Sequence, residues 1–189
     1  MSGNEILLTN VHGSLRLHNP YDVPMTITLF DFSQSATARA WQAIDDRVMG
    51  GVSQSRLRVA NGHAVFEGTV SDRHNGGFAS VRASVTQPVS DDALEHLWIS
   101  TCGSNVVCYI NLRMNDNFDG VSFRASFTVN SEWRRVELPF SEFQPVFRGR
   151  PVTSAPEWTS TDIHQVGLMI ANRQLGVFTV RVGSIGLGY

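Results

Sequence analysis

Short runs of alternating apolar and polar residues, separated by turn residues, recur along most of this chain. Residues 56–59 and 63–70 alternate in this way on either side of Asn61-Gly62. Because Asn and Gly both tolerate the positive φ angles of a type I′ turn, this dipeptide is a strong hairpin signal. We therefore predict two antiparallel strands joined by a two-residue turn.

Further runs of the same kind predict the rest of the fold. Strands are expected at residues 78–85, 97–102, 106–114, 121–129, 134–138, 166–171 and 177–187. We expect 97–102 and 106–114 to form a second hairpin through Gly103-Ser104-Asn105. Helical periodicity is scarce, with room for single turns at 90–95 and 141–143. Many short strands with little helix are typical of an antiparallel sandwich or barrel. At this length we predict an all-β fold, a jelly-roll β-sandwich.

The 189 residues suit one compact domain. We assign residues 25–189 to a single sandwich domain. Residues 1–24 are read as an N-terminal extension, either an edge strand or disordered, with one short apolar run at 13–18. Residues 148–161 are rich in Pro, Ser and Thr and predict a long surface loop.

The composition of the chain argues against several classes of function. Hydrophobic residues make up 42% of the chain, charged residues 17%, and the net charge is −2. A nearly neutral charge argues against nucleic acid or anionic lipid as the main partner. No secretory signal and no apolar run of about 20 residues is seen, so we expect a cytoplasmic protein without membrane insertion. All 15 basic residues are arginine, the residue best suited to forked hydrogen bonds and to stacking on aromatic rings.

The two cysteines, Cys102 and Cys108, lie at a spacing that could place both sulfurs across the second hairpin. In a reducing compartment free structural thiols are favoured over a disulfide, and both states stay open here. No Cys/His cluster has the spacing of a zinc site, and neither a metal nor a cofactor is expected.

The most distinctive segment runs from Trp41 to Ser53 and contains two adjacent aspartates, Asp45 and Asp46, followed by two glycines. Adjacent side chains in an extended segment point to opposite sides, which is a poor geometry for a catalytic carboxylate pair. The favoured interpretation is a loop whose aspartates accept backbone N–H bonds. The glycines would allow a sharp turn or the close approach of another group.

A second segment, Asn75 to Arg82, joins another glycine pair to a strand. Arg82 would need a carboxylate partner if it were buried, and Asp45 or Asp46 is the candidate. The pair would tie the two glycine loops together, and loss of Arg82 would cost about 3–5 kcal/mol. The alternative is that Arg82 is presented to a ligand.

A third segment combines a strand that ends at Pro139, a short aromatic turn, and the sequence Phe-Arg-Gly-Arg at 147–150. Arg148 and Arg150 flank a glycine in a predicted loop, where binding groups concentrate. Two solvated arginines are the equally weighted alternative.

Together these segments resemble the complex I intermediate-associated protein 30 family. The resemblance covers roughly residues 29–187, and its motifs stand in order at Asp46–Ser53, Phe66–Gly68, Gly76–Arg82, Trp133–Phe143, Arg148–Arg150 and Ile163–Phe178. It implies a galactose-binding-like jelly roll. It also implies a non-catalytic role as a protein-binding assembly factor or chaperone-like module, with membrane-complex subunits or assembly intermediates as partners.

The candidate residues fall into two groups. The candidate binding residues are Asp45, Asp46, Ser53, Asn75, Arg82, Arg148 and Arg150. Residues expected to hold the motif in shape are Trp41, Met49, Gly50, Gly51, Gly76, Gly77, Phe78, Trp133 and Phe140.

Two other functions are weighed against the assembly role. The first is a small-ligand or carbohydrate-binding module, with Trp98, Trp158 or Tyr109 as an aromatic platform. A calcium ion near Asp116 or Asp119 belongs to the same hypothesis, although an ordinary polar turn is the favoured interpretation of that run. The second, least favoured, is a hydrolase that uses Asp45, Asp46 or Glu67 as acid and base.

Overall fold

The computed structural model describes residues 26–189 and the backbone of residues 8–11 and 14–17. The first two strands, β1 (Leu8–Val11) and β2 (Ser14–Leu17), pair with each other in an antiparallel ladder. The rest of the predicted extension lies outside the described residues. The assignment of 25–189 to one domain stays a prediction.

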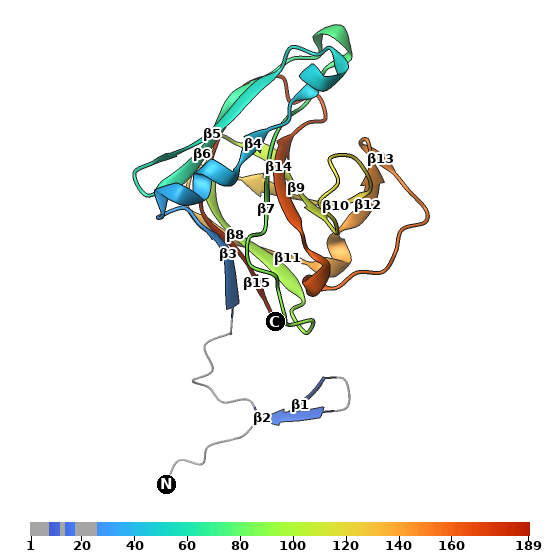
Figure 1. Cartoon of the computed structure of the whole chain (residues 1–189). Coiled ribbons are helices and arrows are strands. Elements are labelled where there is room, and N and C mark those ends of the chain that lie inside the picture. The colour runs from blue at the N-terminus through green and yellow to red at the C-terminus, as the bar shows by residue number, and fades with distance from the viewer. Residues whose placement is uncertain (1–7, 12–13, 18–25) are drawn as a thin grey trace.

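Two antiparallel sheets stacked face to face make up the body of the molecule (Figure 1). The seven-stranded sheet contains, in spatial order, β13 (Arg150–Pro151), β12 (Gln144–Phe147), β10 (Ser122–Val129), β9 (Val106–Arg113), β14 (Gln165–Ile170), β7 (Ala79–Ser84) and β4 (Gln42–Ala43). The six-stranded sheet contains β11 (Arg134–Pro139), β8 (His96–Gly103), β15 (Gly176–Gly188), β6 (His63–Val70) and β5 (Gln54–Ala60), with β3 (Thr26–Asp31) also paired to β15. The predicted all-β sandwich is confirmed.

Alternation along the strands decides which side chains enter the core. In β9, Cys108, Ile110 and Leu112 are fully buried, whereas the residues between them are partly exposed on the outer face. Facing strands supply Phe66, Ile99, Val180 and Ile185 from the other sheet. The inner faces of the two sheets therefore close on one hydrophobic core, and the outer faces are left for other roles.

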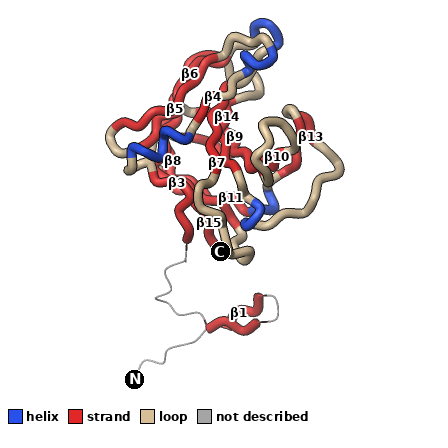
Figure 2. The backbone as a smooth tube through the Cα atoms, in the orientation of Figure 1, coloured by secondary structure: helices blue, strands red, loops and turns tan. Residues whose placement is uncertain are grey.

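Within residues 26–189, helix is confined to five short 3₁₀ turns at the ends and margins of the strands (blue in Figure 2). They are η1 (Ser35–Ala40), η2 (Asp46–Met49), η3 (Arg73–Asn75), η4 (Phe140–Glu142) and η5 (Ser160–Asp162). The turn expected at 141–143 corresponds to η4. At 90–95 there is a turn without a helix, in which the Asp91 carboxylate accepts a bond from the Ala93 amide (3.0 Å).

The hairpin predicted from Asn61-Gly62 is confirmed. Ala60 pairs with His63 across the turn, and the φ angles of Asn61 (53°) and Gly62 (74°) are both positive. This is the backbone geometry that a type I′ turn requires.

The second predicted hairpin is wrong. β8 and β9 lie in different sheets, so the residues between them carry the chain across the edge of the sandwich. The Gly103 and Ser104 amides donate to Asn130 and Thr179 respectively, in other parts of the chain, at 2.7 and 2.9 Å. Cys102 and Cys108 consequently belong to different sheets, and both are free, buried thiols. Burial raises the pKa of the Cys108 thiol to about 12.

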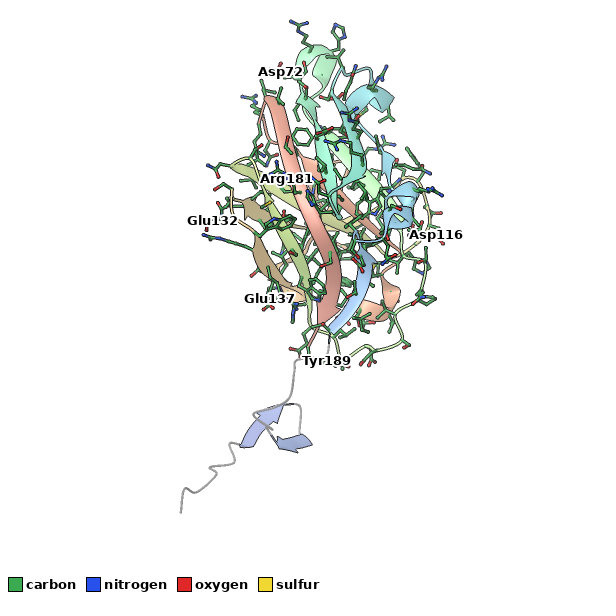
Figure 3. The ribbon with its side chains drawn as sticks, turned by 90° about the vertical axis from the view of Figure 1, so that its left-hand side faces the viewer. Asp72, Asp116, Glu132, Glu137, Arg181 and Tyr189 are labelled. Atoms are coloured by element: carbon green, nitrogen blue, oxygen red, sulfur yellow. The ribbon has the colours of Figure 1, made fainter. Side chains whose placement is uncertain are left out.

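The loop expected at 148–161 contains the two-residue strand β13 and is anchored by Trp158. The Trp158 ring packs against Phe123 (5.2 Å between centroids) and Phe140 (4.9 Å). Figure 3 looks onto the opposite, six-stranded sheet, where Arg181 of β15 and Glu137 of β11 lie exposed on the outer surface. Across the described part of the chain, no helix combines the length and the hydrophobicity needed to span a membrane.

Candidate functional site

The two adjacent aspartates sit at a corner where η2 leads into β5 and η3 leads into β7. The Asp46 side chain is fully buried. Its carboxylate accepts the Ser53 amide (2.9 Å), the Ser53 hydroxyl (2.5 Å), the Gly77 amide (2.8 Å) and the Phe78 amide (3.3 Å). Burial alone would raise the pKa of Asp46, but the bonds from Ser53, Gly77 and Phe78 outweigh it and lower that pKa.

The Asp45 side chain points to the opposite side of the backbone from Asp46 and has its own hydrogen-bond donors. Its carboxylate accepts the amide (2.8 Å) and the hydroxyl (2.6 Å) of Ser55, and the amide of Ser80 (3.0 Å). The prediction that these aspartates accept backbone N–H bonds is confirmed. Ser53, a predicted binding residue, is buried and belongs to this network rather than to an open site.

The buried Asp46 side chain explains why each of the two loops contains a pair of adjacent glycines. Gly50 (φ 88°) and Gly77 (φ 133°) hold the left-handed conformation that lets the chain turn. A methyl group at Gly51 would lie 2.3 Å from Asp46 Oδ1, and one at Gly76 would lie 2.5 Å from Oδ2. In each pair one glycine turns the chain and the other admits the carboxylate. We call Asp45, Asp46, the two glycine pairs and the residues that donate to the two carboxylates the aspartate corner.

Arg82 is not part of the aspartate corner, so the predicted pair with Asp45 or Asp46 is wrong. The carboxylates already have amide and hydroxyl donors from their own loops. Arg82 instead donates from both terminal nitrogens to the Phe118 carbonyl (3.2 Å each) and lies over the Phe118 ring, 5.3 Å from its centroid. The alternative, an arginine facing a ligand site, fits this position.

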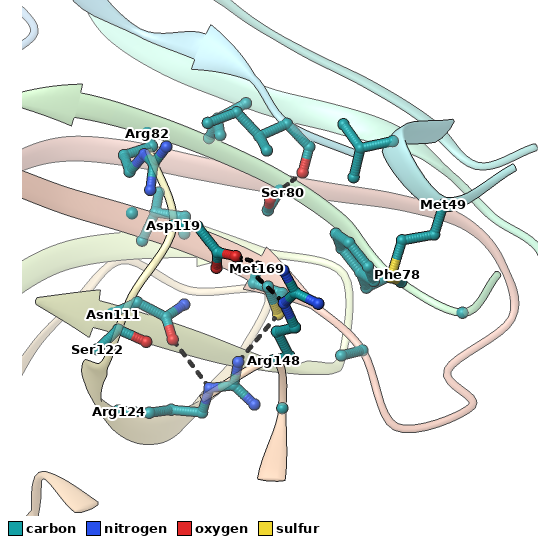
Figure 4. Close-up of a pocket in the computed structure, with 18 of the residues that line it drawn as sticks. Met49, Phe78, Ser80, Arg82, Asn111, Asp119, Ser122, Arg124, Arg148 and Met169 are labelled. Atoms are coloured by element: carbon teal, nitrogen blue, oxygen red, sulfur yellow. Dashed lines mark hydrogen bonds and ion pairs between the residues drawn. The ribbon is translucent and has the colours of Figure 1, made fainter. Parts of the chain in front are cut away.

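A pocket of about 570 Å³ opens on the outer face of the seven-stranded sheet (Figure 4). Its floor is made by β7, β14, β9 and β10, and its rim by η2 and by the loops around residues 118 and 148. A volume of this size is typical of small-ligand sites. We call it the arginine pocket because Arg82, Arg113, Arg124 and Arg148 line it.

Cross-strand register assembles its floor. Arg82 pairs with Gly167, Gly167 with Asn111, and Asn111 with Arg124. Three strand spacings separate the two arginines, about 14 Å between their backbones. Gly167 has no side chain, so the middle of this row stays low and open.

The floor arginines are held by neutral groups. Arg124 donates to Asn111 Oδ1 (2.8 Å) and lies over the Tyr109 ring at 5.3 Å, while Arg113 donates to the Gly120 carbonyl (3.3 Å). Burial lowers the pKa of both guanidinium groups. They remain cations at neutral pH, because arginine begins from so high a value.

One carboxylate lines the arginine pocket. Asp119 Oδ2 accepts two bonds from Arg148, from Nη2 (2.6 Å) and from Nε (3.2 Å). The Arg148 guanidinium lowers the pKa of Asp119. Arg150, the other predicted arginine of this loop, lies exposed in β13 and is not among the lining residues.

The remaining candidates divide between the rim and the framework. Met49 and Phe78 line the arginine pocket, while Asn75 is exposed outside it. Trp41 packs on Phe30, with ring centroids 5.1 Å apart. Trp133 is half exposed and contacts the His63 ring.

None of the three predicted sugar platforms presents an open ring to the arginine pocket. Trp98 is buried under Arg135, Trp158 is packed among phenylalanines, and Tyr109 is covered by Arg124. The loop considered for calcium has Asp119 bound to Arg148 and Asp116 next to His164 (3.4 Å). No group of three or more acidic, His or Cys side chains converges within the described residues.

Sequence reasoning missed Asn111, Arg113 and Arg124. Each is one polar residue in an alternating strand, at an outward position like Arg82. The available signal was that three outward positions in neighbouring strands carry arginine.

Comparisons with known proteins agree with this architecture. Residues 30–182 match the family described as complex I intermediate-associated protein 30. An uncharacterized protein of Schizosaccharomyces pombe is 28% identical over 185 residues, which cover 84% of this chain and 82% of that protein.

Solved structures with the same fold include carbohydrate-binding modules. A family 11 module from Clostridium thermocellum, in complex with a β-1,3-1,4-mixed-linked tetrasaccharide, aligns with a TM-score of 0.61 and 18% identity over 86% of this chain and 94% of that one. A family 29 module aligns with a TM-score of 0.52 and 7% identity over 87% and 91%. The predicted jelly-roll, galactose-binding-like fold is confirmed.

Proposed function

This chain belongs to the complex I intermediate-associated protein 30 family, and from that premise we propose that it is a non-catalytic, protein-binding module related to respiratory complex I assembly factors. The partner is proposed to dock on the outer face of the seven-stranded sheet, across the arginine pocket. The observation that carries this proposal is a cavity lined by arginine and ringed by exposed apolar side chains.

The rim is unusually apolar for a solvated surface. Val48, Met49 and Phe118 line the arginine pocket and are 63%, 58% and 65% exposed. Methionine, aromatic residues and arginine are enriched in the centres of protein–protein interfaces. A partner protein would cover these side chains and supply groups to the cavity between them.

The placement of the carboxylates supports a role without catalysis. Asp45 and Asp46 are saturated by donors of the aspartate corner, and Glu67 is bound by Arg56 and Arg58 on the other sheet. Acid–base hydrolysis of a glycosidic bond needs two carboxyl groups on either side of one substrate. Asp119 is the one carboxylate among the lining residues of the described chain.

The family description names an association with an intermediate of complex I. We propose the same class of partner here, a protein subunit in an assembly intermediate. Cross-linking mass spectrometry on tagged protein from its native cells tests this. Cross-links should join a respiratory-complex subunit to residues around the arginine pocket.

A matched pair of variants makes that test specific. Met49→Ser with Phe118→Ser should abolish the cross-links, while Val177→Ser should leave them intact, because Val177 is 83% exposed but lies on the other sheet. Cross-links that survive the rim variant, or that involve no protein partner, would contradict the proposal.

A carbohydrate ligand is the second candidate, favoured by the shared fold of the solved carbohydrate-binding modules and by the pocket volume. Calorimetric titration with a β-1,3-1,4-mixed-linked tetrasaccharide tests it. Saturable heat that disappears in Arg124→Gln would support sugar binding at this face. The covering of Tyr109 by Arg124 speaks against it, because sugar platforms need an open ring.

A further inference from the structure

The arginine pocket carries an excess of positive charge. Four arginines line it, and its one carboxylate, Asp119, is bound to Arg148. Arg82, Arg113 and Arg124 form no ion pair with any described residue. In a chain with a net charge of −2, four arginines and one carboxylate among the described lining residues leave this cavity with an excess of three positive charges, which favours an anion.

On the opposite face of the sandwich, three arginines are paired with glutamates. On the six-stranded sheet Glu67 binds both Arg56 (2.6 Å) and Arg58 (3.0 Å), and Glu137 binds Arg135 (3.1 Å). These cations are neutralised within the sheet. The arginines of that sheet that lack an ion pair, Arg134 and Arg181, are exposed to solvent. Among the described residues, partly buried arginines without a bound carboxylate therefore occur in the arginine pocket.

The floor arginines also keep unused donors. A guanidinium has five N–H groups in a fixed fork. Among the described residues, Arg82 donates only to the Phe118 carbonyl, and Arg124 only to Asn111 and to the Met169 sulfur (3.5 Å). Burial and the nearby Arg113 lower the pKa of Arg82, and Asp119 offsets them only in part, so a bound anion would relieve an existing repulsion.

We propose that the arginine pocket binds carboxylate side chains of an acidic peptide segment in the partner protein. This inference rests on the proposed function and specifies the chemistry of the segment, which is Asp or Glu residues interspersed with apolar ones. Forked guanidinium–carboxylate bonds would supply the polar contacts, and the apolar rim would pack on the intervening side chains.

Three features favour a peptide over an acidic sugar. Val48 and Met49 at the rim offer apolar contacts to aliphatic or aromatic side chains. The Tyr109 and Phe118 rings each have one face against a guanidinium, so neither offers that face to a sugar. The pocket also already holds one peptide carboxylate, that of Asp119, in a two-bond contact with Arg148.

The test uses three synthetic probes on the full chain. They are a capped hexapeptide of alternating Glu and Phe, the same peptide with Gln in place of Glu, and tetragalacturonate. Fluorescence anisotropy or calorimetry gives each Kd. The Glu peptide should bind at least about tenfold more tightly than the Gln peptide, and its affinity should fall when salt is raised from about 50 to about 300 mM.

Variants then assign the binding to the arginine pocket. Arg82→Gln with Arg124→Gln should weaken the Glu peptide at least about tenfold. Arg150→Gln should leave the Kd unchanged, since it removes a positive charge from an exposed residue outside the cavity. Asp119→Asn should tighten binding, because it removes the carboxylate that competes for Arg148. Melting temperatures confirm that each variant is folded.

The outcomes separate this inference from the proposed function. Equal binding of the Glu and Gln peptides, lost in Met49→Ser with Phe118→Ser, would overturn the acidic segment but support a peptide-binding face. Tighter binding of tetragalacturonate than of either peptide would overturn both. No binding of the Glu peptide at low salt, or undiminished binding by the double arginine variant, would overturn the inference and leave the proposed function to the cross-linking test.

Discussion

The aspartate corner and the arginine pocket both withdraw charged side chains from water, but only the corner fills the hydrogen-bonding capacity of those side chains. Asp46 is fully buried and receives four hydrogen bonds from its own chain. Arg82 and Arg124 are half-buried, and among the described residues they use only some of their N–H groups, on the Phe118 carbonyl, Asn111 and the Met169 sulfur. A buried charge whose hydrogen-bonding capacity is filled by the fold stabilises the fold, whereas a charge that keeps unused donors beside an open cavity is available to a ligand.

The largest effect expected from this contrast is that of Asp46→Ala. The substitution leaves the amides of Ser53, Gly77 and Phe78 buried without their acceptor, and a lost partner costs about 1–3 kcal/mol for each donor. We expect a loss of about 4 kcal/mol in the free energy of unfolding, after relaxation of the loops. Urea denaturation measures it. Asp72→Ala, an exposed aspartate near the same corner, is the control, and equal losses in both variants would refute the role of Asp46.

Substitution of the adjacent glycines Gly50 and Gly51 by alanine should have different costs, because one of them contacts the buried Asp46 carboxylate and the other does not. Gly51→Ala would place a methyl group 2.3 Å from Asp46 Oδ1, which is held by other bonds and cannot retreat, so we expect a cost of about 3 kcal/mol. Gly50→Ala meets open space and costs only its left-handed φ, about 1 kcal/mol. Thermal melts of the two variants rank the effects. The reverse order would show that the turn, rather than the buried carboxylate, governs this corner.

Acid should act on the corner more than on the pocket. Because the folded-state pKa of Asp46 is lowered below its ordinary value of 3.8, the ionised carboxylate contributes stability that is fully present above about pH 4. That contribution is lost as the pH falls through the lowered pKa. As the pH is lowered from about 5 to about 2, the free energy of unfolding should therefore decrease less steeply in Asp46→Asn than in the wild type. Parallel curves would contradict this assignment.

The strands were predictable because alternation reports directly which side chains face the core. Residues 121–129, for example, were expected as a strand and form β10 at Ser122–Val129. The crossing at Gly103 was not predictable in the same way. Alternation fixes the face of each side chain, but it does not say whether the next strand continues the same sheet or begins the other one.

The candidate site was harder to predict from the sequence, for a related reason. The acceptor role of Asp46 was suggested by its own loop, in which Ser53 donates to it from seven residues away. The donors Gly77 and Phe78 lie 31 and 32 residues away in the second glycine loop. The arginine pocket depends on register. Arg82, Asn111 and Arg124 lie far apart in sequence and meet only because β7, β14, β9 and β10 align them in one row. A single sequence does not contain that alignment.

The smallest stability effect is expected for Arg82→Gln, the substitution that a pair with Asp46 would have made severe. Arg82 contacts a carbonyl and an aromatic ring near the surface, so its loss should change the free energy of unfolding by less than about 1 kcal/mol. The same variant, alone or with Arg124→Gln, should weaken binding of an acidic peptide. If Arg82→Gln instead destabilised the chain as much as Asp46→Ala, the cation would belong to the framework. The contrast between a satisfied corner and an unsatisfied pocket would then fail, because both charges would be serving the fold.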